Sequence, residues 1–281
     1  AVQTAAPNLD SNGITLVLYG DVPLISSKTV LSTLKVVNNN TMGLLTVVLE
    51  KPEGYGRIVR DRKGDICGII EQKDATIQQL EIQEVNTGVM AIRTNFLQKW
   101  LPQIGNDNAQ NEYYLTDLIS IADSAGIKIK AVNPGTPEEV KGVNTRKQLS
   151  KLERFYQQKQ ADRLMVNGAT LADPSRVDIR GTVFCDVDTF IDVNTVFEGE
   201  VKLGKNVSVG PNCLITESSI GDNVKIKANT IIENSTICNG VEVGPFARVR
   251  PGTHLSDCLL YTSDAADDSL RVDLGGRRII K

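Results

Sequence analysis

The strongest pattern in the chain is a residue pair of the form apolar-x-apolar that returns every six positions through the second half. Two of the steps shorten to five. Glycine and asparagine stand between many pairs, as in Leu203-Gly204-Lys205-Asn206, and both tolerate the left-handed backbone of a sharp corner. A six-residue period sustained this long predicts a parallel β-helix of about four to five triangular coils. The fourteen pairs are Val177/Ile179, Val183/Cys185, Thr189/Ile191, Thr195/Phe197, Val201/Leu203, Val207/Val209, Cys213/Ile215, Ser218/Ile220, Val224/Ile226, Thr230/Ile232, Ser235/Ile237, Val241/Val243, Ala247/Val249 and Thr253/Leu255.

The first half, residues 14–135, alternates instead between strand-like and helix-like segments. The apolar run 14–19 ends in Gly20-Asp21-Val22-Pro23, which predicts a buried parallel strand that delivers a loop at its carboxyl end. This alternation indicates an α/β domain with ligands at strand carboxyl ends. Further strands are predicted at 44–49, 57–59, 67–70, 85–92 and 128–132, and helices after Ser26 or Ser27, through Phe96, Leu97 and Trp100, and over 113–125.

Residues 145–165 contain neither glycine nor proline and predict one long helix. Leu149, Leu152, Tyr156 and Leu164 fall near one face of that helix, and the other positions are mostly Lys, Arg, Glu and Gln. We interpret the helix as a solvated connector between two domains. The predicted divisions are 1–143 for the α/β domain, 144–172 for the connector, 173–257 for the β-helix and 258–281 for a tail.

Both ends of the chain depart from the pattern of a native protein. The chain opens with Ala1-Val2-Gln3, without an initiator Met or a signal-peptide layout, and resembles the last turn of a helix that starts upstream. The hexad period stops after Leu255, and residues 258–281 resemble a sequencing-library adapter translated in frame. We expect no native structure or function in that tail, and an ordinary acidic-then-basic tail is the alternative.

Composition narrows the classes of function. The 281 residues carry 31 Lys and Arg against 34 Asp and Glu, and the formal net charge of −3 argues against a nucleic-acid or anionic-membrane surface. No apolar run approaches the roughly 18 residues of a membrane-spanning helix. Five scattered cysteines and the single His254 form neither a disulfide framework nor a metal cluster, which favours a reducing, cytoplasmic compartment.

Two polar residues in predicted loops are candidate metal ligands. Asp21 follows the first strand, where a carboxylate can hold Mg²⁺ against substrate phosphates or can simply cap a turn. Gly20 beside it lets a nucleotide approach the backbone closely. Asn144 opens the long helix, so its side chain is either a helix cap or a metal ligand.

Three further segments flank predicted strands. Gly54 and Gly56 can admit a sugar or a phosphate, although such glycines are common in loops. Glu71 lies in a polar stretch typical of a solvated loop, and the amide of Asn86 can bind a hydroxyl or cap a turn. Each of these signals is weak when it is taken alone.

Taken in order, these segments resemble a bacterial enzyme family, the bifunctional N-acetylglucosamine-1-phosphate uridyltransferases / glucosamine-1-phosphate acetyltransferases. The resemblance covers residues 1–257, and its motifs are YGDVPLIS, GYGRIVR, IQEVNTGV, NEYYLTDLI, GVNTRKQLSKLE and GPFARVRPG. It implies a Rossmann-like nucleotidyltransferase domain truncated at its amino terminus, a connector helix and a left-handed parallel β-helix of hexapeptide repeats. It also implies a homotrimer assembled through the β-helix, with no nucleic-acid partner.

The resemblance further implies a reaction and the residues that carry it. UTP and N-acetylglucosamine 1-phosphate would give UDP-N-acetylglucosamine and pyrophosphate with Mg²⁺ as cofactor, through positioning and charge neutralisation. The full-length protein would also transfer acetyl from acetyl-CoA to glucosamine 1-phosphate, for peptidoglycan and lipopolysaccharide precursors. The implied residues are Tyr19, Gly20 and Asp21 at the uridine-diphosphate-sugar site, Gly56, Glu71 and Asn86 at N-acetylglucosamine, Asp21 and Asn144 as catalytic Mg²⁺ ligands, and Arg250 at the acetyltransferase sugar-phosphate site.

Departures from the family imply an internal fragment. The glycine-rich triphosphate loop with its Arg and Lys, the uracil-reading Gln and Gly-Thr and the acetyl-CoA coils have no counterpart, and Arg250 alone represents the acetyltransferase site. We therefore expect no measurable turnover from the 281-residue chain. Two alternatives stay open: a non-catalytic β-helix oligomerisation scaffold, and a glucose-1-phosphate adenylyl- or thymidylyltransferase, which the Asn86-Thr87-Gly88 motif disfavours.

Overall fold

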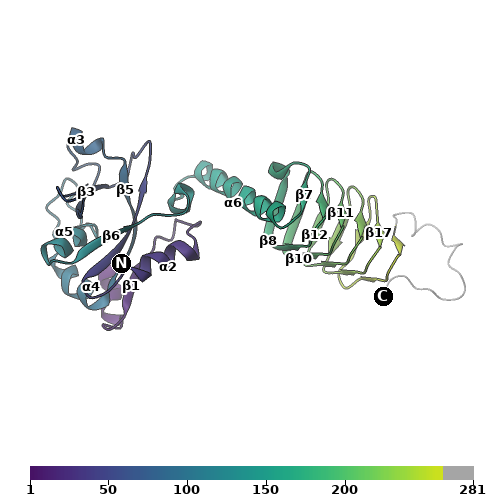
Figure 1. The fold of residues 1–281 in the computed structure, drawn as a ribbon, viewed down its shortest axis with the longest axis horizontal. Helices are drawn as coiled ribbons and strands as arrows, with labels where there is room; N and C mark the ends of the chain where they lie inside the picture. The colour runs from purple at the N-terminus through teal and green to yellow at the C-terminus, as the bar shows by residue number, and fades with distance from the viewer. Residues whose placement is uncertain (262–281) are drawn as a thin grey trace, which may run out of the picture. The chain divides into compact units, whose positions relative to one another are not determined.

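The structure is a computed structural model that describes residues 1–261 (Figure 1). The chain divides within the helix α6 (Arg146–Val166) into two compact units, Ala1–Leu152 and Glu153–Lys281, and each unit has its own apolar core. The first unit is an α/β sheet domain and the second is a solenoid of parallel strands, which confirms the predicted fold class. The finer division into a separate connector and a 173–257 repeat stays a prediction.

A six-stranded mixed sheet forms the first unit. Its strands are β1 (Ile14–Val17), β2 (Thr41–Val48), β3 (Arg57–Arg60), β4 (Ile66–Ile70), β5 (Glu84–Arg93) and β6 (Lys128–Val132). The order is β4-β3-β5-β2-β6, with β1 added to β5. One edge of β5 pairs with β2, and its other edge is shared by β3 at Val85 and by β1 from Met90 onward. The β2–β6 pair is parallel and the other pairs are antiparallel. The long strand β5 is therefore the centre of the sheet.

Short helices precede or connect these strands, and capping side chains explain where two of them begin. They are α1 (Val2–Ala5), η1 (Ala6–Asn8), α2 (Ser27–Lys35), α3 (Ile77–Leu80), α4 (Thr94–Trp100), η2 (Leu101–Gln103), α5 (Asp117–Ser124) and η3 (Pro137–Val140). Ser26 caps α2 by accepting a hydrogen bond from the Thr29 N–H at 3.2 Å, as the sequence predicts. Thr76 and Gln79 form a capping box at α3.

Two expectations for this unit are wrong. The strand β1 is neither parallel nor buried, because it runs antiparallel to β5, leaves Ile14 41% exposed and buries its other three residues only partly. An apolar run indicates a strand but not the direction of its neighbour, and among the described residues β5 is the one partner of β1. The helix α5 begins at Asp117 rather than at 113, since residues 113 and 114 have no regular structure and a turn over 115–116 leads into the helix.

The two faces of the sheet carry separate apolar clusters. Met90 of β5 belongs to the larger cluster, with Leu97 of α4 and Leu118 of α5. Val85 of β5 belongs to the smaller one, with Val140 of η3. The smaller cluster therefore packs η3, and the chain that follows it, against the sheet.

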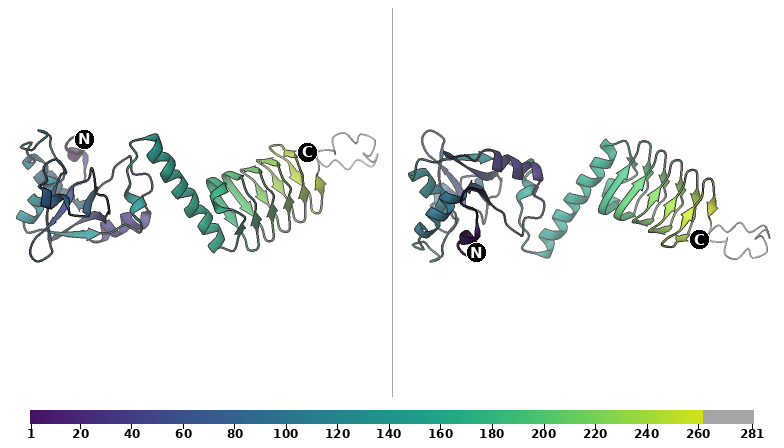
Figure 2. Two further views of the ribbon diagram at one scale, coloured as in Figure 1. Left: turned by 90° about the horizontal axis from the view of Figure 1, so that it is seen from above. Right: turned by 90° about the horizontal axis from the view of Figure 1, so that it is seen from below.

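The second unit stacks short parallel strands into a solenoid, as the further views in Figure 2 also show. Successive turns are 18 or 17 residues apart, since Ile191 faces Val209 and Val209 faces Ile226. Three six-residue steps make 18, and one five-residue step makes 17. The elements after α6 are β7 (Thr170–Leu171), η4 (Pro174–Arg176), β8 (Val177–Cys185), β9 (Phe190–Ile191), β10 (Thr195–Leu203), β11 (Ser208–Val209), β12 (Leu214–Thr216), β13 (Ser219–Ile220), β14 (Lys225–Ile226), β15 (Ile231–Glu233), β16 (Thr236–Ile237), β17 (Glu242–Val243), β18 (Arg248–Val249), β19 (His254–Leu255) and β20 (Leu260–Tyr261).

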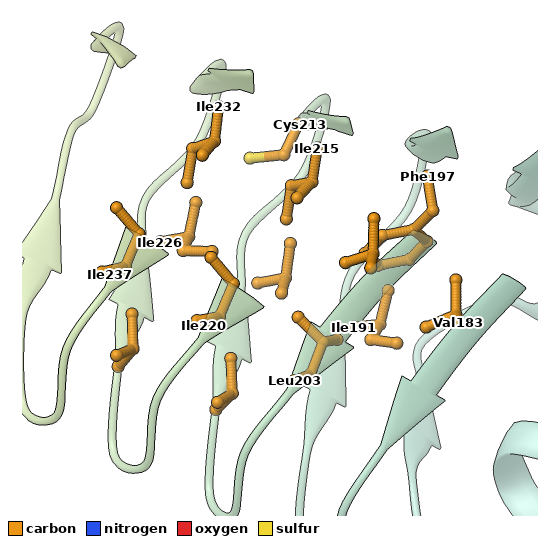
Figure 3. Packing of buried hydrophobic residues seen from close by; sticks show 14 of the residues in the cluster. Val183, Ile191, Phe197, Leu203, Cys213, Ile215, Ile220, Ile226, Ile232 and Ile237 are labelled. Carbon is orange, nitrogen blue, oxygen red and sulfur yellow. The ribbon is translucent and has the colours of Figure 1, made fainter. Parts of the chain in front are cut away.

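The interior of the solenoid confirms the residue pairs predicted from the period. Every residue of the fourteen pairs is buried except Cys185, which is partly buried. Figure 3 shows Phe197, Ile215 and Ile232 pointing into the interior from successive turns. The solenoid thus buries one continuous apolar column, which is its main source of stability.

The corners use left-handed residues where the Gly-x-Asn motif predicts them. Asn206, Asn212 and Asn223 have φ angles of 54°, 58° and 58°. The Asn206 Nδ2 donates to the Asn223 Oδ1 of the next turn at 2.9 Å. A Cβ on Gly204 would lie 2.8 Å from the backbone carbonyl carbon of Gly221, so close stacking of turns requires glycine there.

The solenoid continues one strand beyond the predicted end of the repeat. The strand β20 pairs in parallel with β17, with Tyr261 opposite Val243. A further six-residue step from Thr253/Leu255 leads to Leu259 and Tyr261, which are both partly buried against the core. The remainder of the predicted tail, residues 262–281, lies outside the described residues.

Candidate functional site

A cavity of about 340 Å³ in the first unit gathers most of the predicted site residues. Its lining comes from the stretches 19–22, 53–56, 86–88 and 140–148, together with Glu71. Six of the predicted residues share this cavity, although the first and the last of them are 125 positions apart in the sequence. They are Tyr19, Asp21, Gly56, Glu71, Asn86 and Asn144.

The ring of Tyr19 packs against β5 at Gly88. A Cβ added to Gly88 would lie 2.1 Å from Tyr19 Cε2, and the φ of Gly88 is 83°, so only glycine fits there without strain. Burial, followed by the negative charges of Glu71 and Asp21, raises the pKa of the Tyr19 hydroxyl. The hydroxyl therefore remains a proton donor at neutral pH.

Gly56 and Glu71 are matched to each other at the end of the β3–β4 hairpin. A Cβ on Gly56 would lie 2.8 Å from Ile69 Cγ2 and 3.3 Å from both Glu71 carboxylate oxygens. The Glu71 Oε1 accepts a hydrogen bond from Thr116 Oγ1 at 3.1 Å. The glycine leaves room for the carboxylate, and Thr116 fixes it. Sequence reasoning missed Thr116, because no local pattern links it to Glu71.

Asn86 lies inside β5 and is 8% exposed. Its N–H donates to the Gly56 carbonyl at 2.9 Å, and its Oδ1 accepts from the Gly88 N–H at 3.0 Å. The side-chain oxygen thus has the turn-capping role considered for it. The Nδ2 group makes no hydrogen bond within residues 1–261 and is left as a donor for a ligand.

Asp21 and Asn144 are brought together by the segment that leads into α6. The Val143 N–H donates to the Asp21 carbonyl at 2.9 Å, and a Cβ on Gly142 would lie 3.3 Å from Asp21 Oδ2. Both side chains are exposed in the cavity wall. In the part of the chain that the structure describes, neither the carboxylate nor the side-chain amide accepts or donates a hydrogen bond.

The interpretation of Asn144 as the helix cap is wrong. Thr145 caps α6, because its Oγ1 accepts from the Gln148 N–H at 3.2 Å and its carbonyl from the Leu149 N–H at 3.0 Å. The Asn144 backbone N–H donates to Gln148 Oε1 at 2.9 Å. The first turn of the helix is therefore completed without the Asn144 side chain, which stays available to a ligand.

The donor set of these two residues suits Mg²⁺. A carboxylate and an amide oxygen are hard ligands, and Mg²⁺ often takes one or two protein oxygens and shares the remaining positions with phosphates and water. Asp21, Glu53 and Glu71 line the cavity, and no described Lys or Arg does, so a bound phosphate needs a cation there. Over residues 1–261, no group of three His, Cys, Asp or Glu side chains is spaced to hold a metal. The site fits an ion that the substrate helps to hold.

Two predicted residues do not line this cavity. Gly20 is exposed, with open space around it. Arg250 belongs to the second unit, where it is exposed and its carbonyl accepts from Ser235 Oγ at 2.9 Å. Conversely, Tyr55 and Gln148 line the cavity without having been predicted. The signal for Gln148 was its place in the first turn of the predicted helix, directly after the predicted ligand Asn144.

The fold and the cavity define a class of protein that joins an α/β domain with a cavity to a hexapeptide solenoid. A family model described as the GMPPB C-terminal domain matches residues 179–262. The chain is 50% identical over 256 residues to the bifunctional protein GlmU of Marinobacter nauticus. It is 49% and 52% identical over 257 residues to the proteins of the same name from Idiomarina loihiensis and a Marinomonas species.

These alignments cover 91% to 92% of this chain and 56% to 57% of the relatives. At this identity over nine-tenths of its length the chain is homologous to the GlmU proteins, which confirms the family resemblance of its motifs. The chain spans about 56% of the length of the curated relatives it matches. Within residues 1–261, none of the helices has the length and apolar character needed to cross a membrane.

Proposed function

We propose that the first unit provides the sugar and metal side of a nucleotidyltransferase site, at which UTP and N-acetylglucosamine 1-phosphate give UDP-N-acetylglucosamine and pyrophosphate. The observation that carries the proposal is the convergence of Tyr19, Asp21, Glu71, Asn86 and Asn144 on one cavity from distant parts of the chain. In the whole protein, the solenoid takes part in acetyl transfer from acetyl-CoA to glucosamine 1-phosphate, with Arg250 at the sugar phosphate.

The side chains of the cavity account for binding of the sugar nucleotide. The Glu71 carboxylate, held by Thr116, accepts hydrogen bonds from sugar hydroxyls, and Asn86 donates through its Nδ2. Gly56 leaves the space that the sugar ring needs. The protonated Tyr19 hydroxyl donates to the ligand and lies over the glycine of β5.

Asp21 and Asn144 hold Mg²⁺ in this proposal. When bound, the ion neutralises the phosphates and orients them for attack by the sugar-phosphate oxygen on the α-phosphorus of UTP. The attacking oxygen is already anionic, so no side chain has to remove a proton. This accords with the polar groups of the cavity, which are carboxylates, amides and hydroxyls, and no described residue that lines the cavity is a histidine.

Isothermal titration of the chain with UDP-N-acetylglucosamine tests this function. We expect binding that requires Mg²⁺ and weakens about tenfold or more on Asp21→Asn or Asn144→Ala. Asp123→Asn is the matched control, because Asp123 is an exposed carboxylate of α5 outside the cavity. Binding that survives both EDTA and Asp21→Asn contradicts the metal assignment.

The same titration separates the alternatives. Preference for ADP-glucose or dTDP-glucose indicates a glucose-1-phosphate nucleotidyltransferase, and no sugar-nucleotide binding at all indicates a scaffold. Release of pyrophosphate from UTP and N-acetylglucosamine 1-phosphate tests the prediction that this chain does not turn these substrates over.

We also propose that the protein is a cytoplasmic homotrimer assembled through the solenoid. Sedimentation equilibrium tests the trimeric state.

A further inference from the structure

Among the described residues, Glu139 of η3 is the one buried carboxylate, 5% exposed. Its Oε2 accepts hydrogen bonds from Thr29 Oγ1 at 2.6 Å and from the Ser26 N–H at 3.3 Å. Burial of a carboxylate is strongly unfavourable unless such bonds compensate it. A carboxylate at this position therefore does something that an apolar side chain would not.

The surroundings of Glu139 favour its charge. Ser26 is the cap of α2, so the carboxylate lies at the amino end of that helix, where the unpaired N–H groups and the helix dipole stabilise a negative group. A Cβ on Gly135 would lie 2.9 Å from Glu139 Oε1, so the preceding loop closes over the carboxylate. Thr29 is itself 5% exposed. The contact is thus enclosed and strong.

Two sets of hydrogen bonds, which we call ties, join the segment 139–144 to the stretch 21–29. At one end, the Val143 N–H binds the Asp21 carbonyl. At the other end, Glu139 binds Ser26 and Thr29. Asp21 accepts the first of these hydrogen bonds, and Asn144 directly follows its donor, Val143. The two candidate metal ligands therefore lie beside the first tie.

We propose that Glu139 is a positioning residue that sets the separation of Asp21 and Asn144. Its carboxylate anchors the segment 139–144 to the start of α2 and so holds the Val143–Asp21 hydrogen bond in register. The consequence for metal binding rests on the proposed function, whereas the tie itself does not. Residues that orient metal ligands without touching the metal usually contribute about 10- to 100-fold to metal affinity.

Amide hydrogen exchange of Val143, followed by NMR on the whole chain, tests the tie. Glu139→Gln removes the charge at nearly constant volume, and Thr29→Val removes only the donor hydroxyl. We expect exchange of the Val143 amide to accelerate about tenfold in both variants, as loss of a hydrogen bond to a charged group implies. Glu138→Gln is the control, since Glu138 lies on the same turn but pairs with Lys141 at the surface. Unchanged exchange in Glu139→Gln and Thr29→Val overturns the proposal.

Binding of Mn²⁺ as a probe for Mg²⁺, measured by electron paramagnetic resonance with UDP-N-acetylglucosamine present, tests the positioning role. We expect the dissociation constant for Mn²⁺ to rise about tenfold in Glu139→Gln and Thr29→Val and to stay unchanged in Glu138→Gln. Faster exchange with unaltered Mn²⁺ affinity overturns positioning. Failure of the unmodified chain to bind Mn²⁺ overturns the proposed function and the positioning role with it, while the exchange data still decide whether the tie exists.

Discussion

The two units of this chain are stabilised by different kinds of contact: the solenoid by one contact that repeats, and the α/β unit by contacts that each occur once. In the solenoid each inward residue packs on a counterpart 17 or 18 positions away, and the same rule operates at every turn. In the α/β unit the cavity depends on contacts that occur once, such as Thr116 with Glu71 and Val143 with Asp21. A repeated contact leaves a period in the sequence, whereas a single long-range contact leaves none.

The largest expected effect tests the repeating interior of the solenoid. Phe197→Ala should destabilise the second unit by about 3–5 kcal/mol, because it empties a fully buried aromatic site. Urea denaturation followed by circular dichroism measures the change. Phe184→Ala removes an outward ring that is 54% exposed and should change stability by less than about 1 kcal/mol. Equal losses of unfolding free energy in the two variants would contradict the conclusion that the residues of the six-residue period form the core.

The next effect tests a contact inside the solenoid unit that does not repeat. Gln157 of α6 is buried, and its side chain accepts from the Ile179 N–H at 2.7 Å and donates to the Ile179 carbonyl at 3.0 Å. Gln157→Ala should destabilise the unit by about 1–3 kcal/mol, since both backbone groups lose their partner. Thermal unfolding measures this loss. Gln158→Ala, at an exposed position that bonds Asp162, is the control. Identical midpoints would show that the first turn needs no help from the helix.

A smaller effect tests the cavity of the first unit. Gly88→Ala should weaken UDP-N-acetylglucosamine binding about tenfold, or about 1.4 kcal/mol, because the added Cβ meets the Tyr19 ring and displaces it in the cavity. Gly64→Ala is matched, with a φ of 87° in a hairpin turn and open space around it. Titration calorimetry compares the two variants. Equal binding by both would mean that the Tyr19 contact does not shape the cavity.

The smallest effect concerns an ion pair on the sheet. A hydrogen bond from Arg60 holds the pKa of Glu84 below its usual value. The pair therefore stabilises the fold above the unfolded-state pKa of about 4.3, and this contribution is lost as pH falls through the lower folded value. Because Arg60 is partly exposed, Glu84→Gln should reduce the free energy of unfolding at pH 7 by less than about 1 kcal/mol.

Urea titrations of the wild type and of Glu84→Gln, at pH 7 and at progressively lower pH, measure this difference. We expect the two curves to converge in acid. Glu81→Gln, at an exposed glutamate on the same sheet connection, serves as the control. A difference that grows as pH falls would contradict the assigned sign.

Sequence reasoning reached single side chains in the solenoid because one rule applied fourteen times. Position after position proved buried, and Cys185 alone was only partly so. The same rule also extends past the predicted end of the repeat, since one more step leads to Leu259 and Tyr261. Because the pair recurs fourteen times, an atypical residue in one repeat does not hide the period.

In the α/β unit the kinds of element were predictable, but their partners were not. The hairpin of β3 and β4 and the cap of α2 follow from nearby residues. The direction of β1 depends on β5, which comes much later in the chain. The cavity residues were identified by family resemblance, and Thr116 and Glu139 were missed because their roles depend on remote neighbours.

The way α6 begins separates architecture from chemistry at adjacent positions. Thr145 and Gln148 complete the first helical turn, so the Thr145 cap stabilises the start of the helix. The side chain of Asn144, one residue earlier, does not cap the helix. Under the proposed function, substitution at position 144 should therefore replace one ligand type by another and alter the preference for one ion over another, while the helix that follows stays intact.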